Sequence, residues 1–159
     1  MKLKSKDEIK EIAERLRKEG KKIVFTNGCF DVIHPGHIKS FRFAKSLGDV
    51  LIVGLNSDSS VRRIKGEKRP IIDVKGRSEI LSAIEYIDYI VIFDEDTPEN
   101  LIKVIKPDVL VKGEDWRGKK VVGADFVQSY GGKVEFCPLY PEYSTTKIIE
   151  KILEKYGKI

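Results

Sequence analysis

Residues 22–37 read KIVFTNGCFDVIHPGH, and this stretch indicates the fold of the chain. Residues 22–26 are mostly apolar and predict a strand that is buried on both faces, because no polar residue alternates with the apolar ones. After a loop we expect a helix over 37–47, which Gly48 ends. Together with an apolar strand at 50–55 these elements form a βαβ unit, and such units build parallel sheets with right-handed crossovers.

The alternation of helices and strands continues along the whole chain. The other elements that we expect are a helix at 6–19 with a capping box of Ser5 and Glu8, helical spacing around Ile80, Leu81 and Ile84, a strand at 89–93, a helix with Thr97 as cap and Pro98 at its first position, a strand at 108–111, a helical segment at 123–130, a strand at 133–137 and a terminal helix at 145–155. This order predicts an α/β fold, a doubly wound and mostly parallel sheet with helices on both faces. We expect a single domain over 1–159, in which 1–20 is a packing helix and 21–159 is the catalytic α/β core.

The composition predicts a cytoplasmic protein that acts on small molecules. No apolar stretch approaches the roughly 20 residues that span a bilayer, and the chain begins with charged residues, so we expect neither a signal peptide nor a membrane partner. Cys29 and Cys137 lack metal-ligand spacing and are expected to be reduced thiols. The net charge of +5 is spread along the chain among 25 acidic residues, which favours small polyanionic substrates over nucleic acid.

His34-Pro35-Gly36-His37 lies between the first strand and its helix, at the edge of the sheet where ligands of this fold class bind. A helix start presents unpaired N–H groups and a positive dipole end, and Gly36 would let a phosphate approach the backbone. His34 and His37 can both donate hydrogen bonds to one triphosphate. Positioning and electrostatic stabilisation can supply most of the catalysis in nucleotidyl transfer. Taken alone, the four residues could also be a loop without function or a pair of metal ligands.

The segments around this motif resemble the cytidylyltransferase-like family of nucleotidyltransferases. The resemblance rests on TNGCFD at 26–31, HPGH at 34–37 and GLNSD at 54–58. Four later segments are similar to the branch of the family that acts on D-glycero-β-D-manno-heptose 1-phosphate: VIFDEDTP at 91–98, PDVLVKG at 107–113, VVGAD at 121–125 and STT at 144–146. The similarity covers about residues 20 to 155, and the ordered set is far more specific than any one segment.

This resemblance implies a Rossmann-like nucleotidyltransferase fold and an adenylyltransferase activity. AMP would pass from ATP to the heptose 1-phosphate, giving ADP-heptose, a precursor of lipopolysaccharide-type glycans, and pyrophosphate. Mg²⁺ would be held through the triphosphate, with no metal ligand among the side chains. A separate heptose kinase would supply the sugar 1-phosphate, and we expect a homodimer.

The same resemblance implies roles for individual residues. His34, His37 and Lys65 would be catalytic. The nucleotide would contact Thr26, Asn27, Gly28, Phe30, Gly36, Gly113, Ser144, Thr145 and Thr146. The sugar phosphate would contact Asp31, Asn56, Asp58, Arg69 and Arg77.

Two of these assignments involve a basic segment, residues 62–70 (RRIKGEKRP), which we expect to be a loop. Its five basic side chains and one acidic side chain could bind phosphate, with Lys65 and Arg69 favoured, or could form a solvated charged loop. The loop after the fourth strand is expected near the base and ribose, where Trp116 would either stack on the base or pack on the sheet edge.

The residues before the last helix depart from the family pattern. Ser144, Thr145 and Thr146 would cap that helix and bind the triphosphate, but several relatives carry an arginine just upstream, and residues 141–143 supply none. Lys147 or the 62–69 segment would have to provide that positive charge.

Two other functions stay open on the sequence. One keeps the mechanism but uses CTP and glycerol 3-phosphate or a similar phosphorylated alcohol. The other is a nucleotide- or RNA-binding module without catalysis, which the basic segment and the charge of +5 would suit.

Overall fold

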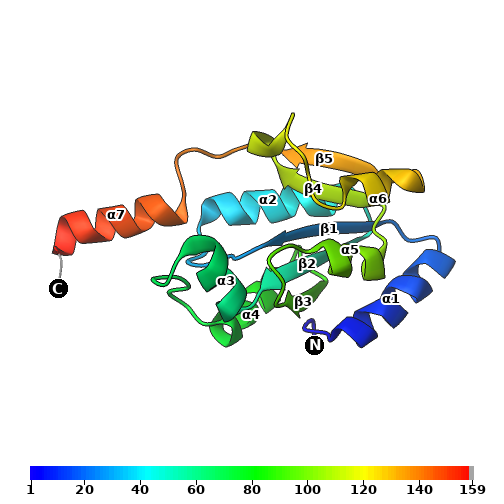
Figure 1. Ribbon diagram of the computed structural model, residues 1–159, viewed down its shortest axis with the longest axis horizontal. Coiled ribbons are helices and arrows are strands. Elements are labelled where there is room, and N and C mark those ends of the chain that lie inside the picture. The colour runs from blue at the N-terminus through cyan, green and yellow to red at the C-terminus, as the bar shows by residue number, and fades with distance from the viewer. Residues whose placement is uncertain (158–159) are drawn as a thin grey trace.

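The computed structural model describes residues 1–157, and a five-stranded, all-parallel sheet forms its centre (Figure 1). The strands are β1 (Ile23–Gly28), β2 (Val50–Asn56), β3 (Tyr89–Phe93), β4 (Val109–Gly113) and β5 (Lys133–Cys137). Their order in the sheet is β3-β2-β1-β4-β5, so the direction of winding reverses between β1 and β4. The α/β class and the doubly wound parallel sheet predicted from the sequence are confirmed.

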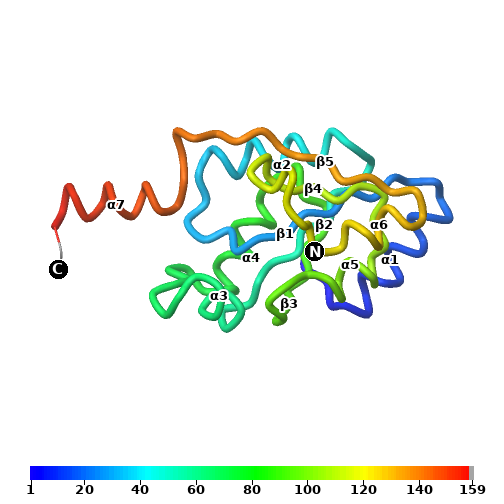
Figure 2. The backbone as a smooth tube through the Cα atoms, turned by 45° about the horizontal axis from the view of Figure 1, so that its top comes forward, coloured from blue at the N-terminus to red at the C-terminus, as the bar shows by residue number. Residues whose placement is uncertain are grey.

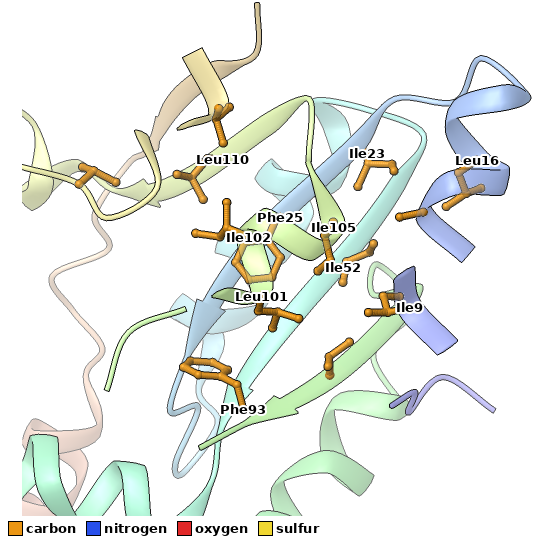
Figure 3. Packing of buried hydrophobic residues seen from close by; sticks show 14 residues of the cluster. Ile9, Leu16, Ile23, Phe25, Ile52, Phe93, Leu101, Ile102, Ile105 and Leu110 are labelled. Atoms are coloured by element: carbon orange, nitrogen blue, oxygen red, sulfur yellow. The ribbon is translucent and has the colours of Figure 1, made fainter. Parts of the chain in front are cut away.

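Both faces of the sheet are covered by helices because successive side chains of a strand point to opposite faces. The helices α1 (Lys6–Lys18), α5 (Glu99–Ile105) and α6 (Ala124–Ser129) pack on one face, and α2 (Pro35–Ser46) and α4 (Val74–Ser82) pack on the other. In β1, Ile23 and Phe25 join the first core, which Figure 3 shows, whereas Val24 joins the second. Each core is closed by an apolar helix face, such as Leu101 and Ile102 of α5.

The structure corrects three details of the expected helices. The helix expected to have Thr97 as cap begins at Glu99, and the carbonyl of Pro98 accepts its first hydrogen bond from Ile102 N–H. Helix α4 ends at Ser82, so Ile84 lies outside it. An unexpected helix, α3 (Asp58–Lys65), occupies part of the basic segment that was expected to be a loop.

Helix α3 forms because its first turn is capped, although its sequence has little apolar periodicity. Ser57 accepts a hydrogen bond from Ser60 N–H at 3.2 Å, and Val61 is fully buried. The last turn is basic, which complements the negative end of the helix dipole.

The N-terminal residues lie against the body of the molecule, whereas the last helix of the described chain projects from it (Figures 1 and 2). Residues 2–4 run beside β3, with an isolated parallel bridge between Leu3 and Ile90. From the carboxyl end of β5 the chain runs on beyond the sheet and enters α7 (Thr145–Tyr156), which buries none of its residues. Across residues 1–157, the structure contains no helix with the length and apolar character of a membrane span.

The reversal between β1 and β4 determines where a ligand can bind. At this point the loops that follow the two strands leave in opposite directions and open a crevice beyond their carboxyl ends. The loop after β1 is the one that carries the two histidines.

Candidate active site

Two cavities open at the carboxyl ends of β1 and β4. The β5-side cavity, of about 480 Å³, extends towards the end of β5 and the 138–141 segment. The α3-side cavity, of about 620 Å³, extends towards α3 and the 96–98 segment. Both volumes fall within the usual range of small-molecule sites, roughly 300–1,000 Å³. The residues that line both cavities, and so form their shared wall, are Asn27, Phe30, His34, His37, Lys112, Tyr143 and Ser144.

The two histidines of the shared wall are held by hydrogen bonds to the backbone of their own loop. His34 Nδ1 accepts from Gly36 N–H at 3.1 Å, and His37 Nδ1 accepts from His34 N–H at 3.2 Å. An imidazole nitrogen that accepts a hydrogen bond carries no proton, so the proton of each neutral ring lies on Nε2. Each histidine therefore offers one N–H donor from Nε2.

The surroundings keep both rings neutral at pH 7. Burial, and to a smaller extent the neighbouring His34, lowers the pKa of His37 to about 4. Burial also lowers the pKa of His34. The ring centroids of the two histidines are 3.8 Å apart, a distance at which two charged rings would repel strongly. The pair is thus suited to donate hydrogen bonds to an anion without first binding a proton.

Aromatic rings hold this histidine pair from both ends. Phe30 meets His37 edge to face, with centroids 5.7 Å apart, and Tyr143 stacks on His34 at 6.3 Å. Phe30 and Val32 both have positive φ angles, 48° and 55°, which are rare for residues other than glycine and most of all for β-branched ones. Backbone strain of this kind occurs where the surrounding structure enforces a functional conformation.

The start of α2 differs from the sequence expectation in one respect. The N–H of Gly36, expected to face a phosphate, instead donates to His34, and the N–H of His37 donates to the carbonyl of His34. A side chain at position 36 would place its Cβ 2.8 Å from His34 Cε1. Gly36 therefore makes room for the His34 ring, and the imidazoles stand where the backbone amides were expected to act.

The α3-side cavity receives two of the five basic side chains of the 62–70 segment. Lys65, the last residue of α3, and Arg69 line it. Arg63 instead pairs with Asp96 at 2.7 Å on the surface. Arg69 Nη2 lies 3.5 Å from Thr146 Oγ1, so the segment reaches across the cavity to the start of α7. Two cations at one end of a cavity favour an anionic ligand there.

Two of the residues expected to contact the sugar phosphate, Asp31 and Asn56, line the α3-side cavity but are engaged elsewhere. The Asp31 carboxylate accepts from Ile71 N–H at 2.7 Å and Ile72 N–H at 3.0 Å, so the residues just after the basic segment are fastened to the loop that carries the histidines, the histidine loop. The side chain of Asn56 donates to Ser60 Oγ within α3.

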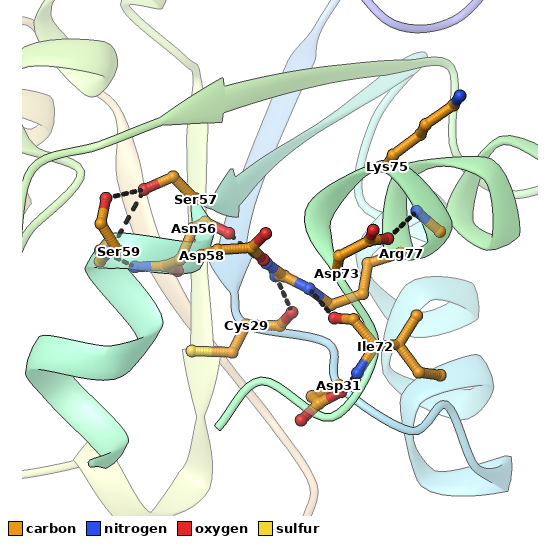
Figure 4. A network of polar contacts seen from close by, with 12 residues as sticks. Cys29, Asp31, Asn56, Ser57, Asp58, Ser59, Ile72, Asp73, Lys75 and Arg77 are labelled. Carbon is orange, nitrogen blue, oxygen red and sulfur yellow. Dashed lines mark hydrogen bonds and ion pairs between the residues drawn. The ribbon is translucent and has the colours of Figure 1, made fainter. Parts of the chain in front are cut away.

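Two others, Asp58 and Arg77, line neither cavity. Arg77 is fully buried below the site and donates to the carbonyls of Cys29, Asn56 and Ile72 and to the Asp58 carboxylate (Figure 4). All of its contacts are internal because the guanidinium fork satisfies backbone carbonyls that the loops leave open. In this structure Asp58 and Arg77 support the segments around the cavity, and their contact with substrate stays a prediction.

The residues expected to bind the nucleotide divide between the cavities. Thr26, Gly36 and Gly113 line the β5-side cavity, whereas Gly28, Thr145 and Thr146 line the α3-side cavity. The hydroxyl of Thr145 donates to the carbonyl of Asp31 at 2.7 Å, so α7 is fastened to the histidine loop. Trp116, which is 41% exposed, lines the α3-side cavity.

The sequence pointed to the loops of the site but missed several side chains. Lys112 and Tyr143 stand in the shared wall, and the segment from Cys137 to Pro141 forms most of the far side of the β5-side cavity. The signal that could have identified Lys112 as a site residue was its position near the carboxyl end of β4, the edge of the sheet where ligands bind. Residues 138–141 carry no motif, and only the path of the chain towards α7 brings them to the site.

Comparison with known proteins supports a nucleotide site. Residues 25–151 match the family model described as cytidylyltransferase-like. The bifunctional protein HldE of Geobacter metallireducens is 58% identical over 157 residues, which cover 99% of this chain and 32% of the relative. HldE of Campylobacter jejuni is 54% identical over 154 residues, with 97% of this chain and 32% of the relative covered. This chain thus spans about a third of the length of these curated relatives.

Solved structures show the same architecture. The lipopolysaccharide core biosynthesis protein of Thermoplasma volcanium is 27% identical and has a TM-score of 0.63, with 76% of this chain and 98% of that chain covered. Pantoate-beta-alanine ligase of Francisella tularensis, with 18% identity and a TM-score of 0.64 over 100% of this chain and 80% of its own, shares the fold.

Proposed function

We propose that this chain, which belongs to the cytidylyltransferase-like family, transfers AMP from ATP to D-glycero-β-D-manno-heptose 1-phosphate, forming ADP-heptose and pyrophosphate. The observation that carries this proposal is the wall shared by two cavities. A transfer between two substrates needs both of them at one set of catalytic groups, and His34 and His37 face both cavities.

The choice of heptose phosphate as acceptor rests on likeness to relatives. The segments at 91–98, 107–113, 121–125 and 144–146 are similar to the heptose branch of the family. Relatives named bifunctional protein HldE match nearly the whole chain at 51–58% identity. The Thermoplasma volcanium structure is named for lipopolysaccharide core biosynthesis, which agrees with a product used for such glycans.

The side chains of the two cavities suggest which substrate each would take. The β5-side cavity has apolar walls, including Phe41, Val111 and Leu139, which suit a base and ribose. The α3-side cavity has Lys65 and Arg69, which suit the phosphate of the acceptor. The triphosphate would then lie along the shared wall, beside His34 and His37.

In the reaction, an oxygen of the sugar phosphate attacks the α-phosphorus of ATP, and the bond to the departing pyrophosphate breaks with its electron pair. Negative charge grows on the leaving oxygen and the oxygens around phosphorus. The Nε2–H groups of His34 and His37 donate to these oxygens, and Lys65 orients the attacking phosphate. Neutral donors fixed by backbone hydrogen bonds need no rearrangement as the charge develops.

Mg²⁺ would enter as part of the ATP substrate. Within residues 1–157 no three His, Cys, Asp or Glu side chains gather as a metal-binding group, so the phosphates of ATP would be the main ligands of the ion. When bound, Mg²⁺ neutralises phosphate charge and polarises the phosphorus–oxygen bonds.

The sugar 1-phosphate must come from a phosphorylation of heptose. Whether the kinase is a separate chain, and whether this chain forms a homodimer, stay predictions.

Pyrophosphate release, measured with each of the four nucleoside triphosphates and a panel of sugar phosphates and glycerol 3-phosphate, tests the proposal. We expect turnover with ATP and the heptose 1-phosphate. Turnover with CTP and glycerol 3-phosphate instead would show that the mechanism is right but the substrates are wrong. RNA affinity that falls steeply with salt, without pyrophosphate release from any pair of nucleotide and acceptor, would favour a binding module without catalysis.

A further inference from the structure

Lys112 lies at the junction of the two cavities. It is the fourth residue of β4, the strand next to β1, and its side chain enters the shared wall beside the histidines. Its ammonium donates to Asn27 Oδ1 at 2.9 Å and lies 5.6 Å from the centre of the Trp116 ring. Among residues 1–157 no other lysine or arginine lines both cavities; Lys147 lines only the β5-side cavity, and Lys65 and Arg69 line only the α3-side cavity.

The charge of Lys112 has no anionic partner within the described part of the chain. Of the ion pairs within 4.0 Å among residues 1–157, none includes it, and the amide oxygen of Asn27 is a neutral acceptor. Burial of the ammonium lowers its pKa, and the charge of Asp115 opposes that shift. A partly buried cation that faces a cavity and lacks a counter-ion is stabilised by an anion bound there.

Lys112 can also supply the positive charge that relatives provide with an arginine just before Ser144 and that residues 141–143 of this chain lack. Lys147, one of the expected replacements, donates its ammonium to the carbonyl of Pro141 and is thereby directed to the loop rather than to the shared wall. Lys65 and Arg69 stand at the acceptor end of the α3-side cavity. Of the lysines and arginines that the structure describes, Lys112 alone combines a position on an inner strand of the sheet with access to both cavities.

We propose that Lys112 is a further catalytic residue, whose ammonium binds the α-phosphate of the nucleotide at the boundary between the two cavities. The assignment rests on the proposed nucleotidyl transfer and deepens it. As the bond from the acceptor oxygen to the α-phosphorus forms and the bond to pyrophosphate breaks, Lys112 keeps its proton. It stabilises the charge on the non-bridging oxygens, while the electron pair of the broken bond leaves with pyrophosphate.

The test measures the affinities of adenosine, AMP, ADP and ATP by calorimetry. Comparing adenosine with the three nucleotides distinguishes the loss of a phosphate contact from a general distortion of the site. Lys112→Met keeps the apolar stem and removes the charge. We expect it to bind AMP, ADP and ATP about 10- to 100-fold more weakly, to bind adenosine within about twofold of the parent chain, and to lower kcat about 100- to 1,000-fold. Lys112→Arg should recover part of both losses because it restores the charge.

Lys119→Met, at an exposed position in the loop that follows β4 and outside both cavities, is the matched control and should leave all affinities unchanged. Lys112→Gln, which can still donate to Asn27, provides a second uncharged variant should Lys112→Met fail to fold. Equal weakening of adenosine and ATP, or no change in either, overturns the assignment. If the parent chain binds ATP but does not act on the heptose phosphate, the proposed function fails while the affinity series still tests Lys112.

Discussion

Arg77 donates from Nη2 to Oδ1 of Asp58 at 2.7 Å, and the same guanidinium contacts Cys29 and Asn56, two residues that line the α3-side cavity (Figure 4). The Arg77 side chain is fully buried and also satisfies three carbonyls, those of Cys29, Asn56 and Ile72. These carbonyls belong to the loop after β1, to the end of β2 and to the segment that follows the basic segment. One guanidinium therefore holds together three segments that are separated in the sequence.

Replacing Arg77 by Met should destabilise the protein severely. The change leaves the Asp58 carboxylate and three carbonyls without a donor, and loss of one partner of a buried pair costs about 3–5 kcal/mol. Arg77→Lys should cost less because a charge remains, although the fork of donors is lost. Urea unfolding measures both, with Lys75→Met, on the exposed side of the same helix, as control. A loss below about 1 kcal/mol for Arg77→Met would contradict this structural role.

The orientation of His37 predicts different outcomes for two amide substitutions. Asn places an oxygen near the position of Nδ1 and can keep the bond from His34 N–H, but it has no group at Nε2. Gln can place an N–H near Nε2. We expect His37→Asn to lower kcat about 100- to 1,000-fold with the fold retained, and His37→Gln to keep more activity. Steady-state kinetics measures kcat of both variants, and circular dichroism checks that both keep the fold. Equal activity of the two variants would refute the assigned tautomer.

The low pKa of His37 predicts a loss of stability in mild acid. The folded pKa of about 4 lies below the usual 6.5, so the unfolded chain binds the proton more readily. The stabilisation of the folded state that comes from a neutral His37 is fully present above pH 6.5 and is lost as the pH falls towards 4. Between pH 7 and pH 5 the free energy of unfolding should fall by about 2 kcal/mol through this group. Urea unfolding at both pH values measures this decrease in the parent chain and in His37→Asn. The free energy of unfolding should fall further in the parent chain than in the variant, because the titration of carboxylates common to both proteins cancels in the difference.

Gly36→Ala tests whether Gly36 serves the His34 ring. The new methyl would lie 2.8 Å from His34 Cε1 and force the imidazole to turn. The gain in helix propensity, about 1 kcal/mol, and the loss of the His34 cap, also about 1 kcal/mol, should nearly cancel in stability. Turnover should nevertheless fall about 100-fold, because the Nε2–H donor moves. Thermal unfolding and kinetics measure the two effects, and Ser46→Ala at the far end of α2 should change neither by much. Full activity in Gly36→Ala would show that the ring position does not matter.

Local patterns were enough to predict most of the elements. The apolar runs of β1 to β5 and the periodic helices are set by short-range spacing, so their bounds agree with the structure to within a few residues. The exception is α3, whose Ser57 cap was visible but whose single buried apolar residue, Val61, gives no periodic signal. The segment therefore resembled a charged loop.

The sequence by itself determined the α/β class and the place of His34 and His37, because a strand, a loop with glycine and a helix follow one another within 25 residues and short-range sterics fix their order. Only the tertiary structure decided what the polar side chains do. Arg77, expected at the substrate, is buried because three distant loops leave carbonyls that need a donor. Lys112 enters the shared wall because β4 pairs with β1, a pairing that joins residues some 85 positions apart and that no local pattern records.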